Sequence, residues 1–234
     1  SSAASDVYKR QQNEVCGSIP TMMQKSTEIK IRKPDDWHLH LRDGDALKVT
    51  VPNACRGFNR GIIMPNLVPP VTTVDLAHEY RKRIVQHIPQ DSSWQPLMVL
   101  FLTDRTTPEE IYKAHDSKII FGVKLYPAGA TTNSDTGVTN LSKLNKTFAA
   151  MQEVGMVLQI HGEVTDKNID IFDREAVFIE TILKPLVEKF PTLKVSLEHI
   201  TTEESVTFVT KDSDSVHASI TPQHLLYNRN DMLV

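Results

Sequence analysis

Short apolar runs that alternate with amphipathic segments constrain the fold of this chain more than any other feature. Seven runs have the length and composition of β-strands: residues 37–41, 61–66, 97–104, 121–127, 157–162, 195–200 and 218–222. Such alternation is typical of parallel βα units. A closed (β/α)8 barrel has eight strands and about 250 residues. The 234 residues therefore predict an α/β fold, a TIM-type barrel that is incomplete because its eighth strand is missing.

Four segments between these runs have helical periodicity: residues 72–88, 108–114, 141–154 and 171–190. In the first, apolar side chains recur at helical spacing at Leu76, Tyr80, Ile84 and Ile88. Gly155 and Pro191 follow the last two segments, and both are residues at which helices end. The helical segments therefore support the parallel arrangement.

The first run carries an unusual pair of histidines. Because successive side chains of a strand point to opposite faces, His38, His40 and Arg42 are expected to share one face. Neutral imidazole is the commonest transition-metal ligand, and two on one face can chelate an ion if further ligands come from elsewhere. Alone, the motif is a weak signal, because His-x-His also occurs on solvated strand edges.

Three later runs supply possible partners, because each contains or ends in a polar residue: Lys124, His161 and His199. Functional residues of βα barrels gather at the carboxyl ends of the strands. The convergence of four strands favours a metal site over isolated surface histidines. For Lys124 the alternative is a side chain that extends to the rim with its charge in water.

Five stretches resemble the amidohydrolase superfamily, and within it the dihydroorotases of the short, monofunctional bacterial-type class. They are residues 35–45 (DDWHLHLRDGD), 64–73 (MPNLVPPVTT), 124–134 (KLYPAGATTNS), 161–164 (HGEV) and 198–202 (EHITT). The resemblance implies reversible, zinc-dependent hydrolysis and cyclisation between (S)-dihydroorotate and N-carbamoyl-L-aspartate in de novo pyrimidine biosynthesis. Two other functions stay open: another cyclic amidohydrolase, hydantoinase- or allantoinase-like, and a non-catalytic scaffold.

The resemblance also implies a site with two Zn²⁺ ions. His38 and His40 would hold one, His161 and His199 the other, and carboxylated Lys124 would bridge them. The chemistry is reasonable, since an ammonium group has no lone pair, whereas a buried lysine with a lowered pKa can react with carbon dioxide to form an anionic carbamate. The carbamate offers one oxygen to each metal.

By the same resemblance, four residues bind the substrate: Arg42, Asn66, Thr131 and Thr132. Arg42 and Asn66 would anchor the substrate carboxylate, for which a guanidinium group has the right planar fork of donors. The threonines belong to a loop that would close over the substrate and that favours dihydroorotase over related hydrolases. The alternative for Arg42 is an ion pair with Asp43 or Asp45.

No residue of the chain is assigned as the catalytic acid or base. The family takes an aspartate from the eighth strand, which would lie beyond Val234, so the chain as given is expected to be inactive. The complete protein is expected to be a homodimer. Asp104 also ends a strand run, but we interpret it as a capping or structural carboxylate.

Composition limits the remaining possibilities. The chain has 26 basic and 29 acidic residues and no basic stripe, which disfavours nucleic acid as a partner. No apolar run approaches the roughly 20 residues that span a bilayer. The two cysteines, Cys16 and Cys55, suit a reducing compartment, so a cytoplasmic protein is expected, or an organellar one if residues 1–26 are a transit remnant.

Two regions are predicted. Residues 1–27 are polar and lie outside the resemblance, so they are expected to form a disordered or non-native extension. Residues 28–234 are expected to form the metal-dependent amidohydrolase barrel, truncated at its carboxyl end.

Overall fold

The computed structural model describes residues 28–233. The expectations for residues 1–27, including those for Cys16 and a transit remnant, lie outside the described residues. The chain divides into two compact units, Ser1–Arg32 and Lys33–Val234. In the described part of the first, Lys30 Nζ lies 3.8 Å from Glu28 Oε1. The predicted domain boundary stays a prediction, and the second unit is described below.

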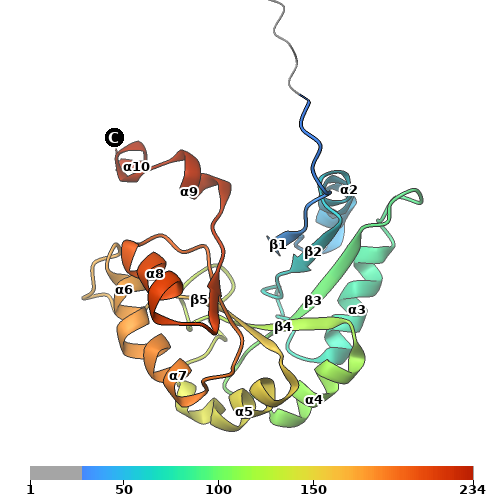
Figure 1. Ribbon diagram of the computed structural model, residues 1–234. Helices are drawn as coiled ribbons and strands as arrows, with labels where there is room; N and C mark the ends of the chain where they lie inside the picture. Colours follow the sequence, from blue (N-terminus) through green and yellow to red (C-terminus); the bar gives the residue numbers. More distant parts are fainter. Residues whose placement is uncertain (1–27, 234) are drawn as a thin grey trace, which may run out of the picture. The chain divides into compact units, whose positions relative to one another are not determined.

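The second unit contains a parallel sheet of seven strands in sequential order from β1 to β7. The strands are β1 (Asp36–Leu39), β2 (Arg60–Ile63), β3 (Gln95–Phe101), β4 (Ile120–Leu125), β5 (Val157–His161), β6 (Val195–Glu198) and β7 (Val216–Ala218). The sheet curls into a half-barrel (Figure 1). Within the described residues, β1 and β7 each pair with one strand only. This confirms the predicted incomplete TIM-type barrel.

Helices α2 to α8 lie along the outer, convex face of the curled sheet (Figure 1). They are α2 (Leu47–Gly57), α3 (Val74–Val85), α4 (Pro108–Ser117), α5 (Asn145–Val154), α6 (Arg174–Phe178), α7 (Lys184–Lys189) and α8 (Glu203–Thr207). Shorter 3-10 and π-helical turns are η1 (Gly44–Ala46), η2 (Leu141–Leu144), η3 (Ile179–Leu183) and η4 (Phe208–Asp212). The main apolar core packs between α2 to α8 and the sheet. Two further helices, α9 (Pro222–Leu226) and α10 (Arg229–Leu233), follow β7 and bury no residue.

Helix α3 shows both what the periodicity predicts and where it fails. Its amino end is capped by Thr73, whose hydroxyl accepts a hydrogen bond from Leu76 N at 3.3 Å. Tyr80 and Ile84 are buried as expected, but the Leu76 side chain is 43% exposed. The buried face instead includes Ala77, which is three residues before Tyr80 rather than four.

The structure differs from the predicted elements at two further places. The seventh strand lies at Val216–Ala218 rather than at residues 218–222, because Pro222 is the first residue of α9. Helix α2 was not predicted at all. It buries Leu47 and Val51 at helical spacing despite containing Pro52, a residue that normally interrupts helices.

The concave face of the sheet changes character from one end to the other. On β2 and β3 it carries a small apolar cluster that includes Ile62 and Val99. On β4, β5 and β6 the buried residues include Lys124, Gln159 and Glu198. The polar half of this face is therefore where a functional site is expected. In the described part of the chain, no helix is long and apolar enough to cross a membrane.

Candidate active site

All five predicted metal ligands lie at or just beyond the carboxyl ends of their strands. Lys124 and His161 belong to β4 and β5, whereas His199 directly follows β6. His38 is in β1 and His40 is the first residue after it. The structure therefore brings together residues that are separated by up to 161 positions in the sequence.

The four histidines form two pairs. The Nε2 atoms of His38 and His40 lie 3.1 Å apart. In the second pair, His161 Nδ1 lies 3.1 Å from His199 Nε2. The rings of His38 and His199 connect the pairs, with centroids 5.3 Å apart. A zinc ion with Zn–N bonds of about 2.0–2.1 Å can span two nitrogens at such a separation.

The surroundings keep the imidazoles of His40 and His199 neutral. Burial, with the nearby charge of His38, lowers the pKa of His40 to about 4. Burial and the charge of Lys124 lower the pKa of His199 to about 3. A neutral imidazole retains the lone pair that a metal requires. Both residues are therefore electronically suited to be ligands near neutral pH.

Lys124 lies against this histidine cluster and is fully buried, with no exposed side-chain surface. Its Nζ lies 3.1 Å from Glu198 Oε2. Burial lowers the pKa of Lys124, whereas the charge of Glu198 acts in the opposite direction. The buried position excludes the predicted alternative of a side chain that reaches water. A lowered pKa favours the neutral amine, which is the form that reacts with carbon dioxide.

Glu198 is the residue of this cluster that sequence reasoning missed. Its side chain is 1% exposed and accepts hydrogen bonds from Lys124 Nζ, from His38 Nδ1 and, at 3.2 Å, from Ser196 Oγ. Burial acts to raise the pKa of Glu198, but the charge of Lys124 and the His38 hydrogen bond outweigh it and lower the pKa to about 2. The one available signal was a carboxylate inside an apolar run, directly before His199.

Each histidine pair can bind one metal ion, but neither pair alone provides enough ligands for a complete metal site. Within residues 28–233, no group of three or more His, Cys, Asp or Glu side chains is arranged to hold one metal ion. Each histidine pair provides two nitrogens, and zinc sites in proteins use three or four protein ligands. Each pair therefore needs at least one further ligand to hold a zinc ion. A carboxylated Lys124 would supply one oxygen to each.

Arg42 does not share the strand face on which it was predicted to lie. Strand β1 ends at Leu39, and Arg42 has a left-handed backbone with φ of 62°. The predicted alternative of a rim ion pair is also not found, because Asp43 pairs with Arg83 at 2.7 Å. Among the described residues, the Arg42 guanidinium has no hydrogen-bond or ion-pair partner. Its charge nevertheless acts on His40 and lowers the pKa of that residue.

Asn66 connects the histidine cluster to the predicted substrate loop. Its side chain is 3% exposed and lies within hydrogen-bonding reach of His40. Asn66 Nδ2 donates to Thr132 O at 3.0 Å, and Asn133 Nδ2 donates back to Asn66 O at 3.1 Å. The side chains of Thr131 and Thr132 are exposed. These hydrogen bonds hold the loop beside His40, whereas the exposed side chains of its two threonines are accessible to a ligand.

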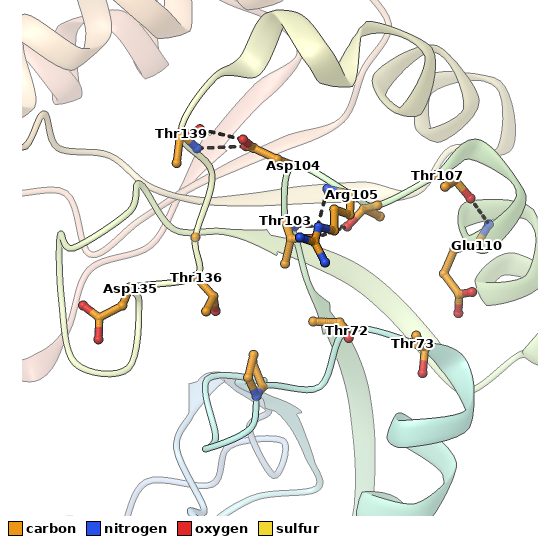
Figure 2. A pocket seen from close by; sticks show the side chains of 13 residues that line it. Thr72, Thr73, Thr103, Asp104, Arg105, Thr107, Glu110, Asp135, Thr136 and Thr139 are labelled. Carbon is orange, nitrogen blue, oxygen red and sulfur yellow. Dashed lines mark hydrogen bonds between the residues drawn. The ribbon is translucent and has the colours of Figure 1, made fainter.

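Asp104 has the structural role that the sequence predicts. Its carboxylate accepts hydrogen bonds from Thr139 N at 2.9 Å and from Thr139 Oγ1 (Figure 2). It also accepts a hydrogen bond from Lys143 Nζ at 3.0 Å. These bonds tie the loop after β3 to the segment before η2. The Thr139 side-chain bond is the main reason that the pKa of Asp104 lies well below its ordinary value.

We expect Asp104→Ala to lower the free energy of unfolding by about 1–3 kcal/mol at pH 7, since hydrogen bonds to a charged group are lost. Because the folded-state pKa is depressed, this contribution is complete above about pH 4 and decreases as the pH falls through the depressed value. Urea unfolding at pH 7 and pH 3 measures both effects. Asp135→Ala is the matched control, and a loss of metal binding with unchanged stability would contradict the structural role.

A cavity of about 640 Å³ lies among the loops that follow β2, β3 and β4 (Figure 2). It is lined by threonines, by Arg105 and by one limb of the substrate loop, at Asp135 and Thr136. None of the predicted site residues lines it. The cavity is therefore separate from the histidine cluster.

Comparison with curated proteins connects this geometry to known enzymes. A dihydroorotase from Acaryochloris marina is 59% identical over 208 residues, which cover 89% of this chain and 59% of the relative. A dihydroorotase from Hahella chejuensis is 56% identical over 208 residues, which cover 89% of this chain and 60% of the relative. The chain thus spans about 60% of the length of these relatives, and the predicted resemblance to dihydroorotases is confirmed.

Solved structures agree with the sequence relatives. The crystal structure of dihydroorotase from Campylobacter jejuni matches with a TM-score of 0.79 and 36% identity over 88% of this chain and 61% of that chain. An L-hydantoinase from Arthrobacter aurescens, at a TM-score of 0.70 but 20% identity over 85% of this chain and 49% of that chain, shares the fold alone. The model of the amidohydrolase family matches residues 35–232, which include every site residue described above. The chain therefore belongs to the amidohydrolase family.

Proposed function

We propose that this protein is a dihydroorotase that interconverts (S)-dihydroorotate and N-carbamoyl-L-aspartate in pyrimidine biosynthesis. The observation that carries the proposal is the gathering of two histidine pairs and Lys124 around the buried Glu198, with the unpartnered Arg42 nearby. The relatives named dihydroorotase support the same reaction. A small-molecule substrate follows from it, and a homodimer and a cytoplasmic location are proposed with it.

The family is generally metal-dependent, and we assign two zinc ions to this site. His38 and His40 would hold one, His161 and His199 the second, and carboxylated Lys124 would contact both. Bound zinc would supply Lewis acidity and lower the pKa of a water molecule to about 7, which makes a nucleophile available at neutral pH.

The chain's own residues would orient the substrate. The Arg42 guanidinium would bind the substrate carboxylate in a two-pronged contact, with the Asn66 amide beside it. Thr131 and Thr132 would close over the ring and donate hydrogen bonds to it. Closure of such a loop removes water from the reacting groups and strengthens their electrostatic interactions. The aspartate that moves the proton is not assigned to any described residue.

Substrate selectivity tests the proposal. We expect the zinc-loaded full-length protein, rather than the 234 residues alone, to hydrolyse dihydroorotate in clear preference to hydantoin and dihydrouracil, because only dihydroorotate carries the carboxylate that Arg42 would bind. Chromatographic detection of the ring-opened products measures the three rates. Equal or faster hydrolysis of hydantoin would favour a related cyclic amidohydrolase. Zinc binding without turnover of any of the three would favour a scaffold.

Glu198 provides a second test, because it fixes which nitrogen of His38 faces His40. With Nδ1 bonded to Glu198, the Nε2 lone pair is directed toward His40. Loss of such a carboxylate partner typically reduces metal affinity by about 10- to 100-fold. We expect that loss for Glu198→Gln, measured by competition with a chelator. Ser196→Ala, which removes only a hydrogen bond to the same carboxylate, should retain nearly full affinity, and equal affinities of both variants would contradict the role.

A further inference from the structure

The hydroxyl of Tyr126 is a buried polar group without a hydrogen-bond partner in the described part of the chain. The side chain is 2% exposed. Native proteins rarely bury a hydroxyl in this way, and phenylalanine would occupy the same space without the cost of desolvating an oxygen. The hydroxyl therefore calls for a functional explanation.

The position of the ring places this hydroxyl at the candidate site. Tyr126 is the first residue after β4 and lies two residues after Lys124. The Tyr126 ring centroid lies 6.1 Å from that of His161 and 5.2 Å from Lys124 Nζ. On its other side the ring stacks on Phe101 at 5.2 Å. Packing thus holds the ring in one orientation beside the histidine cluster.

The Tyr126 hydroxyl can act as a hydrogen-bond donor. The ordinary pKa of a tyrosine phenol is about 10, so the group carries its proton at neutral pH. A phenol O–H can donate to a carbonyl oxygen.

We propose that Tyr126 is a catalytic residue whose hydroxyl donates a hydrogen bond to the carbonyl oxygen of the ring amide that is hydrolysed. The inference rests on the proposed function. A substrate whose carboxylate is bound by Arg42 and whose ring amide lies at the histidine cluster would lie beside the Tyr126 phenol. Negative charge develops on the amide oxygen as water adds to the carbonyl, and a fixed donor at that oxygen stabilises the transition state.

The test is Tyr126→Phe in the zinc-loaded full-length protein. Removing one such donor typically lowers kcat by about 10²- to 10³-fold, and we expect a loss of that size with little change in KM or zinc content. Thermal stability should be unchanged or higher, because the hydroxyl makes no bond within the described chain. Tyr126→Phe is expected to leave the backbone bond from Val138 N to Tyr126 O intact.

Two tyrosines provide matched controls. Tyr80 is equally buried, but its hydroxyl donates to Arg42 O at 2.5 Å, so Tyr80→Phe should lower the melting temperature. Tyr112 is exposed and bonds to Glu153, so Tyr112→Phe should leave kcat unchanged. An unchanged kcat in Tyr126→Phe would overturn the inference, as would an effect on KM alone. Absence of dihydroorotate turnover in the wild type would instead overturn the proposed function.

Discussion

Replacing Lys124 by alanine should reduce zinc from two ions per chain to at most one and abolish turnover of dihydroorotate, because the carbamate is the only proposed ligand common to both metals. The substitution also leaves Glu198 buried without its cationic partner. Breaking a buried ion pair from one side costs about 3–5 kcal/mol of stability. Metal analysis of the purified variant and a melting curve measure both effects.

Loss of zinc must be separated from loss of fold. Lys124→Ala combined with Glu198→Gln removes the buried negative charge, so it should recover part of the stability while still holding at most one zinc. Lys143→Ala is the control, because Lys143 also pairs with a carboxylate, Asp104, but away from the histidines. A stable Lys124→Ala variant with two tightly bound zinc ions and full activity would show that the bridging role is wrong.

Replacing Arg42 by alanine should weaken binding of both dihydroorotate and carbamoyl aspartate, since both carry the carboxylate that the guanidinium would contact. The Arg42 side chain is exposed in the free protein, so the cost of truncating one partner of a buried charge pair, about 2–5 kcal/mol of binding free energy, applies where the closed loop covers the bound substrate. Zinc content should not change, because Arg42 contributes no donor to the histidine pairs. Kinetics in the hydrolytic and the synthetic direction, together with metal analysis, provide the measurement.

Arg105→Ala is the matched control for Arg42. Arg105 is also exposed and lies on a neighbouring loop, but it lines the separate cavity rather than the histidine cluster. We expect unchanged KM values for Arg105→Ala in both the hydrolytic and the synthetic direction. If Arg42→Ala and Arg105→Ala behaved alike, the Arg42 guanidinium would contribute only general charge to this surface.

The strand-borne part of the site was predictable from sequence because its geometry is local. An apolar run of strand length that ends in a histidine places that side chain at the working edge of a parallel sheet. The strand positions of His161 and Lys124 needed no further information, whereas their role as metal ligands rests on the family resemblance. The prediction failed at Arg42, where alternation along a strand was assumed to continue although the chain leaves β1 at Leu39. A left-handed residue directly after a strand has no reliable signature in a single sequence.

The contacts that organise the site were not predictable, because they join distant segments. Glu198 accepts a hydrogen bond from His38, which is 160 residues earlier in the sequence. Asp43 pairs with Arg83, 40 residues later, and not with Arg42. Helix α2 was missed for a different reason, since Pro52 disguises a helical pattern that tertiary packing stabilises. Tyr126 could have been singled out from its spacing to Lys124, but its unpartnered hydroxyl is visible only in the folded chain.

Anomalous diffraction at the zinc edge from crystals of the metal-loaded protein would locate the zinc ions relative to the histidine pairs and Lys124. We expect two zinc peaks, one bound by His38 and His40 and the other by His161 and His199, with density for a carbamate on Lys124 Nζ that contacts both. A single peak, peaks away from these histidines, or an unmodified Lys124 still bonded to Glu198 in the presence of two zinc ions would contradict this expectation.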